Sequence, residues 1–438
     1  MYRCQQKLLN PAQFETRVLE VLCEQSNKLM NCTTYLFRQA FFTFGVVITD
    51  IFEAQFFLKD NPHYQRLYSQ SAQKVIETVG ESFKSFKELR EKFFKGELKD
   101  EPKLPNYRKK NGLAQITYPK QALKFNKNKR EVRLPLGNKF KDNFGFKEIW
   151  IDFPYNLNFD NIKELRIIPR NLAFYAEWVY KTHKKETDLD DQRILAIDPG
   201  LDNWLTCLSN VKRSFIIDGK KIKSQNQWYN KQAAKIKTGK DKDYWDEELS
   251  RLAEKRNRQL KDSINKAARF IINFCLKNRI KTLVFGWNNR NKNAIELGKK
   301  NNQEFVQIPT ARLKDRICQL GEEYGIEFIQ TEEAYTSKAS FLDNDTLFKF
   351  GEKPKDNKFS GKRVKRGLYR ASNGKLINAD LNGAGNIARK VSEQLGLDSL
   401  DLIKTCRDAL THPKRYSLDR LSRLYRQQSE ATCFQTVA

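Results

Sequence analysis

No two of the eight cysteines are spaced as a CxxC pair; they are scattered at positions 4, 23, 32, 207, 275, 318, 406 and 433. Without such pairs the sequence predicts neither a disulfide framework nor a zinc ribbon. Unpaired cysteines are typical of a reducing intracellular compartment. We therefore expect the protein in the cytoplasm of a prokaryote, near the nucleoid, or in the nucleus if its source is eukaryotic.

The sequence also lacks long apolar runs, a signal peptide and a lipidation motif. No apolar stretch approaches the roughly 18 residues that a membrane-spanning helix needs, so we expect no membrane partner. Hydrophobic residues nevertheless make up 39% of the chain and aromatic residues 12%. At 438 residues, this content suffices for roughly two to three folded domains.

Acidic residues are scarce relative to basic ones. The 53 Asp and Glu face 81 Lys and Arg, which gives a net charge of +28. Such an excess exceeds what solubility requires and predicts a polyanionic partner, most simply nucleic acid. An anionic membrane surface is the alternative, but no membrane-inserting segment supports it.

The first half of the chain changes texture along its length. Apolar residues recur at helical spacing from Pro11 to Glu97, which predicts a helical lobe over 11–100. From Lys103 to Lys147, thirteen Lys or Arg face two acids, and apolar and basic residues alternate with the period of a strand. We expect a β-barrel over 101–190, with residues 1–10 as its first strand and the helical lobe as an insertion or neighbour.

Aromatic residues interrupt the basic pattern, a combination that suits a phosphate backbone and its bases. The alternative is an ordinary solvated surface. The residues that we expect to bind nucleic acid here are Tyr107, Arg108, Lys109, Lys110, Lys124, Lys127, Lys129 and Arg130.

The second half begins with "RILAIDPGLDNWLTCLSN", an apolar run that ends in Asp198 and returns as a second strand. Further strands are predicted at "RSFIID", "KTLVFGW" and "IEFIQTEEAY", and helices at residues 243–278, at "TARLKDRICQLGEEYG" and at "LINADLNGAGNIARKVSEQ". The order β-β-β-α-β-α-β-α is that of an RNase H-like domain with a mixed sheet. The predicted fold is therefore α+β and multidomain, with a nuclease-like domain over 191–413 and a basic tail over 414–438.

Carboxylates mark the ends of these elements. Asp198 ends the first strand, Glu332 and Glu333 end the last one, and Asp380 lies in the first turn of a helix. Hard carboxylate oxygens suit Mg²⁺, and two such ions stabilise the attacking and leaving oxygens when water cleaves a phosphodiester. Taken alone, Asp380 could equally be a helix N-cap. The three positions together predict a two-metal Mg²⁺ site.

The motifs "AIDPGLDN", "GKKNNQEFVQIP", "TEEAYTSKASF" and "NADLNGAGNIARK" resemble the RuvC-type nuclease domain of the TnpB (OrfB) proteins of insertion sequences. Fanzor proteins and compact type V CRISPR effectors are their relatives. The resemblance implies an RNA-guided DNA endonuclease associated with a transposable element. It also implies a guide RNA and double-stranded target DNA as partners, with the helical lobe and barrel holding the guide.

Two features depart from that family pattern. The fourth strand carries Gly286 where many relatives have a Glu, and a subset of relatives uses instead the Glu before "AYTS", here Glu333. Because neighbouring strand residues point to opposite faces, either Glu332 or Glu333 faces the site, and we choose Glu333. Metal ligands and catalytic residues are therefore expected to be Asp198, Glu333 and Asp380.

The second departure is the loop at 339–376, where relatives often carry two CxxC pairs and this chain has no cysteine. We interpret it as a degenerate zinc ribbon that binds no zinc, with Ala339 and Arg370 at former cysteine positions. The alternative is an ordinary exposed basic loop. In the second half, the residues expected to contact nucleic acid are Lys299, Lys300, Lys338, Lys362, Arg363, Lys365 and Arg366.

Two other functions remain open at this point. A nuclease-inactive RNA-guided repressor is compatible with the missing strand-four Glu, although such a protein would be expected to lose Asp198 or Asp380 as well. A DNA-joining transposase also uses three acids, but no separate end-binding domain is recognisable. The oligomeric state, the flanking DNA motif and the role of the C-terminal tail stay undetermined by the sequence.

Overall fold

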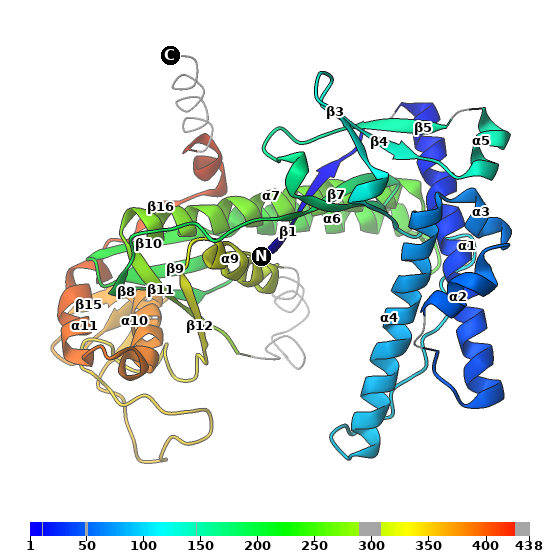
Figure 1. Ribbon diagram of the computed structural model, residues 1–438. Helices are drawn as coiled ribbons and strands as arrows, with labels where there is room; N and C mark the ends of the chain where they lie inside the picture. Colours follow the sequence, from blue (N-terminus) through cyan, green and yellow to red (C-terminus); the bar gives the residue numbers. More distant parts are fainter. Residues whose placement is uncertain (11, 49–50, 146, 289–307, 425–438) are drawn as a thin grey trace. The chain divides into compact units, whose positions relative to one another are not determined.

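The computed structural model describes residues 1–10, 12–48, 51–145, 147–288 and 308–424. The chain forms two compact units, Met1–His183 and Lys184–Ala438, which Figure 1 draws in blue to green and in green to red. No helix among the described residues is long and apolar enough to cross a membrane.

The first unit combines helices with two antiparallel sheets. Its helices are α1 (Gln13–Phe44), α2 (Ile51–Leu58), α3 (Pro62–Arg66), α4 (Ser69–Phe94) and α5 (Asn138–Phe144), with short 3₁₀ turns η1 (Lys120–Ala122) and η2 (Phe159–Asn161). Its strands are β1 (Tyr2–Leu8), β2 (Ile116–Pro119), β3 (Lys124–Asn126), β4 (Glu131–Pro135), β5 (Glu148–Asp152), β6 (Ile162–Arg170) and β7 (Ala173–Lys181). The strands that we expected to form a barrel lie in two sheets, of order β1-β7-β6-β2 and β3-β4-β5.

The pairing of β1 with β7 makes the helical lobe an insertion. Tyr2 pairs with Lys181 and Leu8 with Tyr175, so the first strand joins the last strand of the unit. The α1–α4 segment is therefore inserted between two strands of one sheet. Helices and sheets share one core, in which the rings of Phe37 in α1 and Phe83 in α4 meet edge to face at 5.1 Å.

The second unit is built on a six-stranded mixed sheet of order β12-β11-β8-β9-β10-β16. Its strands are β8 (Asp190–Pro199), β9 (Asn203–Ser209), β10 (Arg213–Asp218), β11 (Ile280–Gly286), β12 (Glu327–Thr331) and β16 (Lys414–Tyr416). β8, β9 and β10 are antiparallel neighbours, whereas β11, β12 and β16 join in parallel. This is the RNase H-like arrangement expected from the sequence, extended at one edge by β16.

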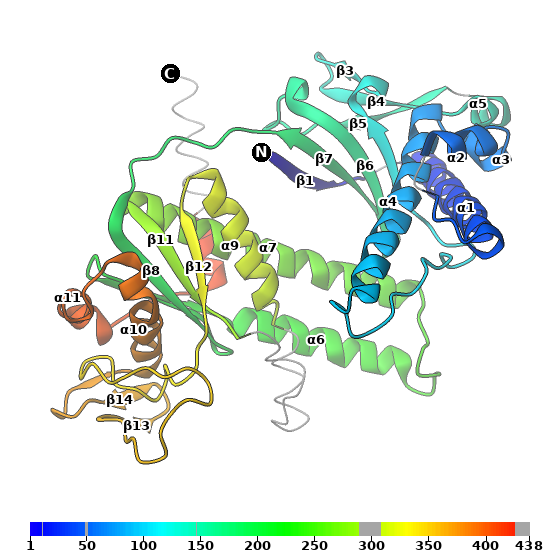
Figure 2. The same ribbon diagram turned by 60° about the horizontal axis from the view of Figure 1, so that its bottom comes forward.

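Helices cover both faces of this sheet. They are α6 (Lys220–Lys237), α7 (Glu247–Lys277), α9 (Thr310–Glu323), α10 (Ala379–Ser392) and α11 (Ser399–Cys406), with η3 (Glu393–Leu395) and η4 (Arg407–Leu410). Figure 2 shows α10 and α11 on the side of the sheet opposite to α7 and α9. A separate small sheet holds β13 (Lys362–Lys365), β14 (Leu368–Arg370) and β15 (Leu376–Asn378).

Alternate side chains of β8 pack into the helical layers on the two faces of the sheet. Leu195 and Ile197 belong to the core formed with α7 and α9, whereas Ile194 and Ala196 belong to the core formed with α10 and α11. Side chains of a strand alternate between its faces, so Asp198 shares the face of Ala196 and points toward α10.

Two parts of the second unit differ from the sequence-based expectation. The helical stretch expected at 243–278 is preceded by another helix, α6, which packs along α7. The basic tail expected after 413 is, in its described part, no free tail, because β16 pairs with β10 and Leu418 and Leu421 are buried in the core beneath α7.

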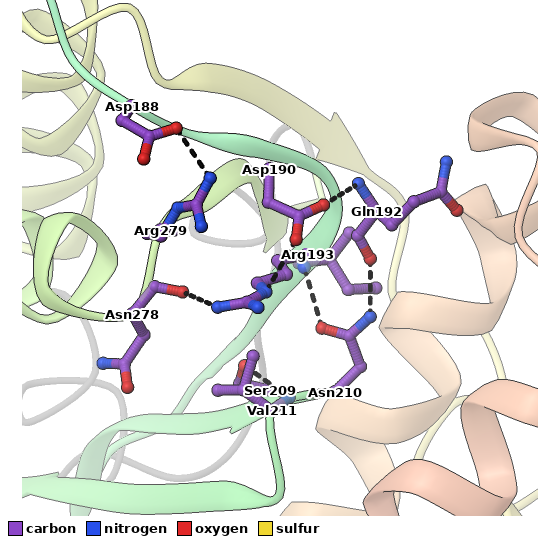
Figure 3. Close-up of polar contacts among 10 residues, drawn as sticks. Asp188, Asp190, Gln192, Arg193, Ser209, Asn210, Val211, Asn278 and Arg279 are labelled. Atoms are coloured by element: carbon purple, nitrogen blue, oxygen red, sulfur yellow. Dashed lines mark hydrogen bonds and ion pairs between the residues drawn. The ribbon is translucent and has the colours of Figure 1, made fainter.

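Polar contacts fix the start of β8 (Figure 3). The Arg193 guanidinium donates to the Asn278 carbonyl at 3.0 Å and pairs with Asp190 at 2.8 Å. The Ile194 amide donates to the Asn210 side chain, which in turn donates to the Gln192 carbonyl. These bonds tie the strand to the turn after α7 and to the β9–β10 turn, and so hold the register that places Asp198 at its other end.

Candidate nuclease site

Asp198 approaches helix α10 at a glycine. An ideal Cβ on Gly383 would lie only 2.6 Å from Asp198 Oδ2, which is closer than atoms of side chains pack. The small residue therefore makes the contact between strand and helix possible. Asp198 is half-buried in this position.

Asp380 reaches the same place from the first turn of α10, and it is not the N-cap. Asn378 caps the helix, because its side chain accepts hydrogen bonds from the Asp380 and Leu381 amides, both at 3.0 Å. The Asp380 carboxylate is thus left free for other contacts. It accepts a hydrogen bond from Asn203 Nδ2 at 2.6 Å and pairs with Arg363 at 3.5 Å.

Glu333 follows β12 and lies against the end of β11. Its amide donates to Asn288 Oδ1 at 2.9 Å, and its Oε2 accepts from Asn288 Nδ2 at 3.3 Å. An ideal Cβ on Gly286 would lie 3.0 Å from both Glu333 Cγ and Oε1. Glu333 therefore occupies the space beside the position where the sequence comparison expected a Glu on strand four.

Glu332, the alternative, has a different partner. Its carboxylate pairs at 3.0 Å with Lys390 of α10, whose side chain is 8% exposed. Glu332 thus serves as the counter-ion of a buried lysine, whereas Glu333 interacts with Asp198. This placement favours Glu333 as the residue that faces the site.

The carboxylates are close enough to perturb one another. Burial, followed by the charges of Glu333 and Asp380, raises the pKa of Asp198 well above its ordinary value, against a smaller opposing effect of Arg363. Burial raises the pKa of Glu333 to about 7, although Lys390 opposes the shift. A site of this kind binds either protons or cations.

The residues fit a hard divalent cation in their chemistry. Within the described part of the chain, Glu333 Oε1 is buried and has no hydrogen-bond partner, and the three side chains supply only carboxylate oxygens. In their present arrangement, no three His, Cys, Asp or Glu side chains of the described residues are gathered closely enough to hold one ion. Arg363 and Asn203 instead engage the two oxygens of Asp380.

A cleft of about 1020 Å³ opens beside Asp198 and Asp380. Cationic side chains also line it, among them Lys220, Arg363 and Arg366. Arg366 pairs with Asp202, another residue of the cleft wall. The cleft therefore carries both carboxylate and cationic side chains.

The loop interpreted as a zinc-ribbon remnant is held by aspartates and serines. Asp343 accepts hydrogen bonds from Ser340 Oγ at 2.6 Å and from the Ser372 amide and hydroxyl at 2.8 and 2.6 Å. Asp345 accepts from the Ser340 amide at 2.7 Å and from Ser360. We call these five residues the Asp–Ser clasp. Burial alone would raise the pKa of Asp343, but the bonds from Ser340 and Ser372 outweigh it and lower that pKa.

Most of the residues expected to bind nucleic acid are exposed, and some of them already contact other side chains. Exposed in the structure are Tyr107, Lys109, Lys110, Lys124, Lys127, Lys129, Lys338, Lys362, Arg363, Lys365 and Arg366. Arg130 has a structural contact instead, because its guanidinium donates to the Pro154, Tyr155 and Leu157 carbonyls. Arg108 is bound by Asn27 of α1 at 2.9 Å. Lys299 and Lys300 lie outside the described residues.

Three residues of the site were not found from the sequence. Asn203 and Asn288 contact Asp380 and Glu333, and Arg415 contacts Asn203. Asn203 lies in the "GLDN" part of the motif from which we predict only Asp198 as a metal ligand. Arg415 carried no signal, because a three-residue basic strand cannot be told from a tail.

Fold and site define the second unit as an RNase H-like domain with a carboxylate site at one sheet edge. Residues 177–292 match the family model OrfB_IS605, described as a probable transposase. This match confirms, for that segment, the resemblance to TnpB/OrfB proteins that the motifs indicated. No curated protein matches the chain in sequence.

Solved structures also align with this chain. A Cas12f1–sgRNA–target DNA complex aligns with TM-score 0.54 and 16% identity, over 86% of this chain and 83% of that one. The mini-RNA-guided endonuclease CRISPR-Cas_phi3 aligns with TM-score 0.46 and 11% identity, over 89% and 92%. At this level of identity the likeness to Cas12f1 is one of fold.

Proposed function

We propose that this chain is an RNA-guided DNA endonuclease of the TnpB type that cleaves target DNA by metal-dependent phosphodiester hydrolysis. The observation that carries the proposal is the convergence of Asp198, Glu333 and Asp380 from β8, from the end of β12 and from α10. Such convergence brings half-buried carboxylates together, and their mutual repulsion is a cost that a purely structural site would avoid.

In the proposed reaction, the acidic and the cationic side chains have different tasks. Mg²⁺ held by Asp198, Glu333 and Asp380 would stabilise the charge on the attacking and leaving oxygens. Lys220 and Arg366, which line the cleft, would bind backbone phosphates of the DNA. Asn203 and Asn288 orient two of the carboxylates through the hydrogen bonds described above.

Guide RNA and double-stranded DNA are the proposed partners. The net charge of +28 and the exposed lysines of the first unit supply phosphate contacts. The aligned Cas12f1 structure is a complex with sgRNA and target DNA, and the proposal extends that pair of partners to this chain.

The first test is to sequence the RNA that co-purifies with the full-length protein. One defined species ending in a variable segment is expected, and DNA matching that segment should be cut in the presence of Mg²⁺. Absence of RNA would favour a DNA-joining transposase. Guided binding without cutting by the parent protein would favour a repressor.

The second test replaces each acid. Asp198→Ala, Glu333→Ala and Asp380→Ala should each nearly abolish cleavage, and double substitutions should be little worse than single ones, because the three groups act as one unit. Glu332→Ala is the matched control and should cleave near the parent rate. RNA and target binding should survive in all four. A dead Glu332→Ala with an active Glu333→Ala would reverse the assignment.

A further inference from the structure

Arg415 contacts the candidate site from the C-terminal segment, whose role could not be predicted from its residues. Its strand β16 pairs in parallel with β10, with Arg415 opposite Ile216. The following residues Leu418 and Leu421 are buried in the core, which anchors the strand from its other end. The position of Arg415 at the rim of the cleft is therefore fixed by packing on both sides.

Two hydrogen bonds connect Arg415 to Asp380. Arg415 Nη1 donates to Asn203 Oδ1 at 2.9 Å, and Asn203 Nδ2 donates to Asp380 Oδ2 at 2.6 Å. A guanidinium only donates and a carboxylate only accepts, so the two ends together fix which way the Asn203 amide is turned. With Arg415 removed, the Asn203 side chain keeps only its bond to Asp380 and loses the second contact that holds it in place.

From this geometry we infer that Arg415 is a positioning residue for Asp380 and acts through Asn203. The inference rests on the proposed function, since it assigns Asp380 to a metal ion. The Asn203 bond holds Oδ2, which leaves Oδ1 toward Arg363 and the cleft. Arg415 itself is exposed, so its charge is screened by solvent, and its effect is to hold the amide in one orientation.

The test measures Mn²⁺ binding to the full-length protein by the electron paramagnetic resonance signal of free Mn²⁺, with Asp380→Ala defining the background. Asn203→Ala should weaken the Asp380-dependent binding by about 10–100-fold, as removal of a group that orients a metal ligand typically does. Arg415→Ala should weaken it less, by about 3–10-fold. Arg415→Lys, which can still donate to Asn203, should retain most of the affinity.

The double variant separates positioning from other roles. If Arg415 acts through Asn203, Asn203→Ala with Arg415→Ala should bind Mn²⁺ no more weakly than Asn203→Ala alone. Additive losses would instead give Arg415 an independent role, such as a phosphate contact. Lys414→Ala is the matched control, because it removes the same charge from the neighbouring position of β16, where the lysine lies over the Tyr416 ring.

The outcomes distinguish the proposed metal site from the role inferred for Arg415. Equal Mn²⁺ binding by the parent and Asp380→Ala would overturn the proposed metal site itself. A large effect of Asp380→Ala together with unchanged binding by Arg415→Ala would overturn only the inference drawn from β16. Melting curves of every variant report folding, and Arg415→Met, which keeps the alkyl stem, replaces Arg415→Ala if that variant is unfolded.

Discussion

Gly286 and Glu333 share one space: a side chain at position 286 would lie within 3.0 Å of the Glu333 carboxylate. Gly286 is the last residue of β11, on the same face of the sheet as Val284, which packs against α10. The glycine and the glutamate are therefore complementary. Position 286 has no side chain, and the Glu333 carboxylate lies in the space beside it.

We therefore predict that a carboxylate at position 286 can replace the one at position 333. Glu333→Ala should remove cleavage, and adding Gly286→Glu to it should restore a measurable fraction, because both positions deliver a carboxylate to the same space. The Ile387 Cδ1 atom, 2.5 Å from the new Cβ, is the end of a flexible side chain and can shift. Gly286→Gln in the Glu333→Ala background is the isosteric control and should stay inactive. Equal activity of the Glu and Gln versions would contradict the prediction.

Gly383 allows a second test of close packing. Gly383→Ala places a methyl group 2.6 Å from Asp198 Oδ2, so the carboxylate must move, and cleavage should fall by about 10²-fold for a displacement near 1 Å. Gly321→Ala, in α9, is the control, because its Cβ would meet nothing closer than the Ile326 carbonyl oxygen at 3.4 Å. That variant should cleave normally and gain up to about 1 kcal/mol in stability. Normal cleavage by Gly383→Ala would show that the contact is not needed.

The pKa of Glu333 predicts how Mg²⁺ and pH act together. Because this pKa is raised from 4.5 to about 7, Glu333 stabilises the metal-free fold fully below pH 4.5 and loses that contribution as the pH rises through 7. Asp198 shifts in the same direction. Bound Mg²⁺ replaces the protons, so it should raise the melting temperature more at about pH 8 than at about pH 5.5.

The same competition should appear in catalysis, with cleavage rising as the pH increases through about 7. Glu333→Gln, which cannot titrate, should show a smaller difference between the Mg²⁺-induced melting shifts at the two pH values. A Mg²⁺ effect on stability that is larger in acid would rule out this account of the site.

Because the hydrogen bonds of the Asp–Ser clasp hold the 339–376 loop together, we predict that this loop needs no zinc. Elemental analysis of the pure protein should find no stoichiometric zinc, since a structural zinc site uses four Cys or His ligands. Asp343→Ala removes an acceptor of three hydrogen bonds and should make the 340–372 region more sensitive to proteases. Asp356→Ala, at another acid of the same loop, is the comparison. About one zinc per chain would overturn the interpretation.

Lys127 and Arg130 should respond differently although they are three residues apart. Lys127 is exposed, so Lys127→Gln should weaken RNA binding and reduce its salt dependence by about one phosphate contact, with melting unchanged. Arg130→Gln should instead lower the melting temperature, because three carbonyls lose their donor. Similar melting temperatures for both variants would contradict the structural role of Arg130.

Periodicity and motif spacing predicted the elements of the second unit that carry the acids. The strand ending in Asp198, the strand before Glu333 and the helix holding Asp380 follow from patterns confined to about ten residues each. Helix α6 escaped prediction because its sequence is polar on most sides. β16 escaped it because three residues show no period, and its pairing with β10 depends on a contact almost two hundred residues away in sequence.

The sequence predicts where these residues lie along the helices and strands better than it predicts which side chains they contact. Nothing in a run of Lys and Arg distinguishes Arg130, which turns back onto its own unit, from the lysines around it. The ion pair of Glu332 with Lys390 likewise joins residues more than fifty positions apart in the chain. Long-range packing decides both cases, and a single sequence does not record it.

The pairing of β1 with β7 also dictates when the first unit can fold during synthesis. The partners Tyr2 and Lys181 enclose the whole helical lobe and the second sheet. Helices α1 and α4 can pair early, but the strand edge offered by β1 must wait until residue 181 has left the ribosome. Such a distant pairing makes folding slow relative to local structure. During that interval the nascent chain already carries the exposed basic residues at 107–130, while the sheet of β1 and β7 is still incomplete.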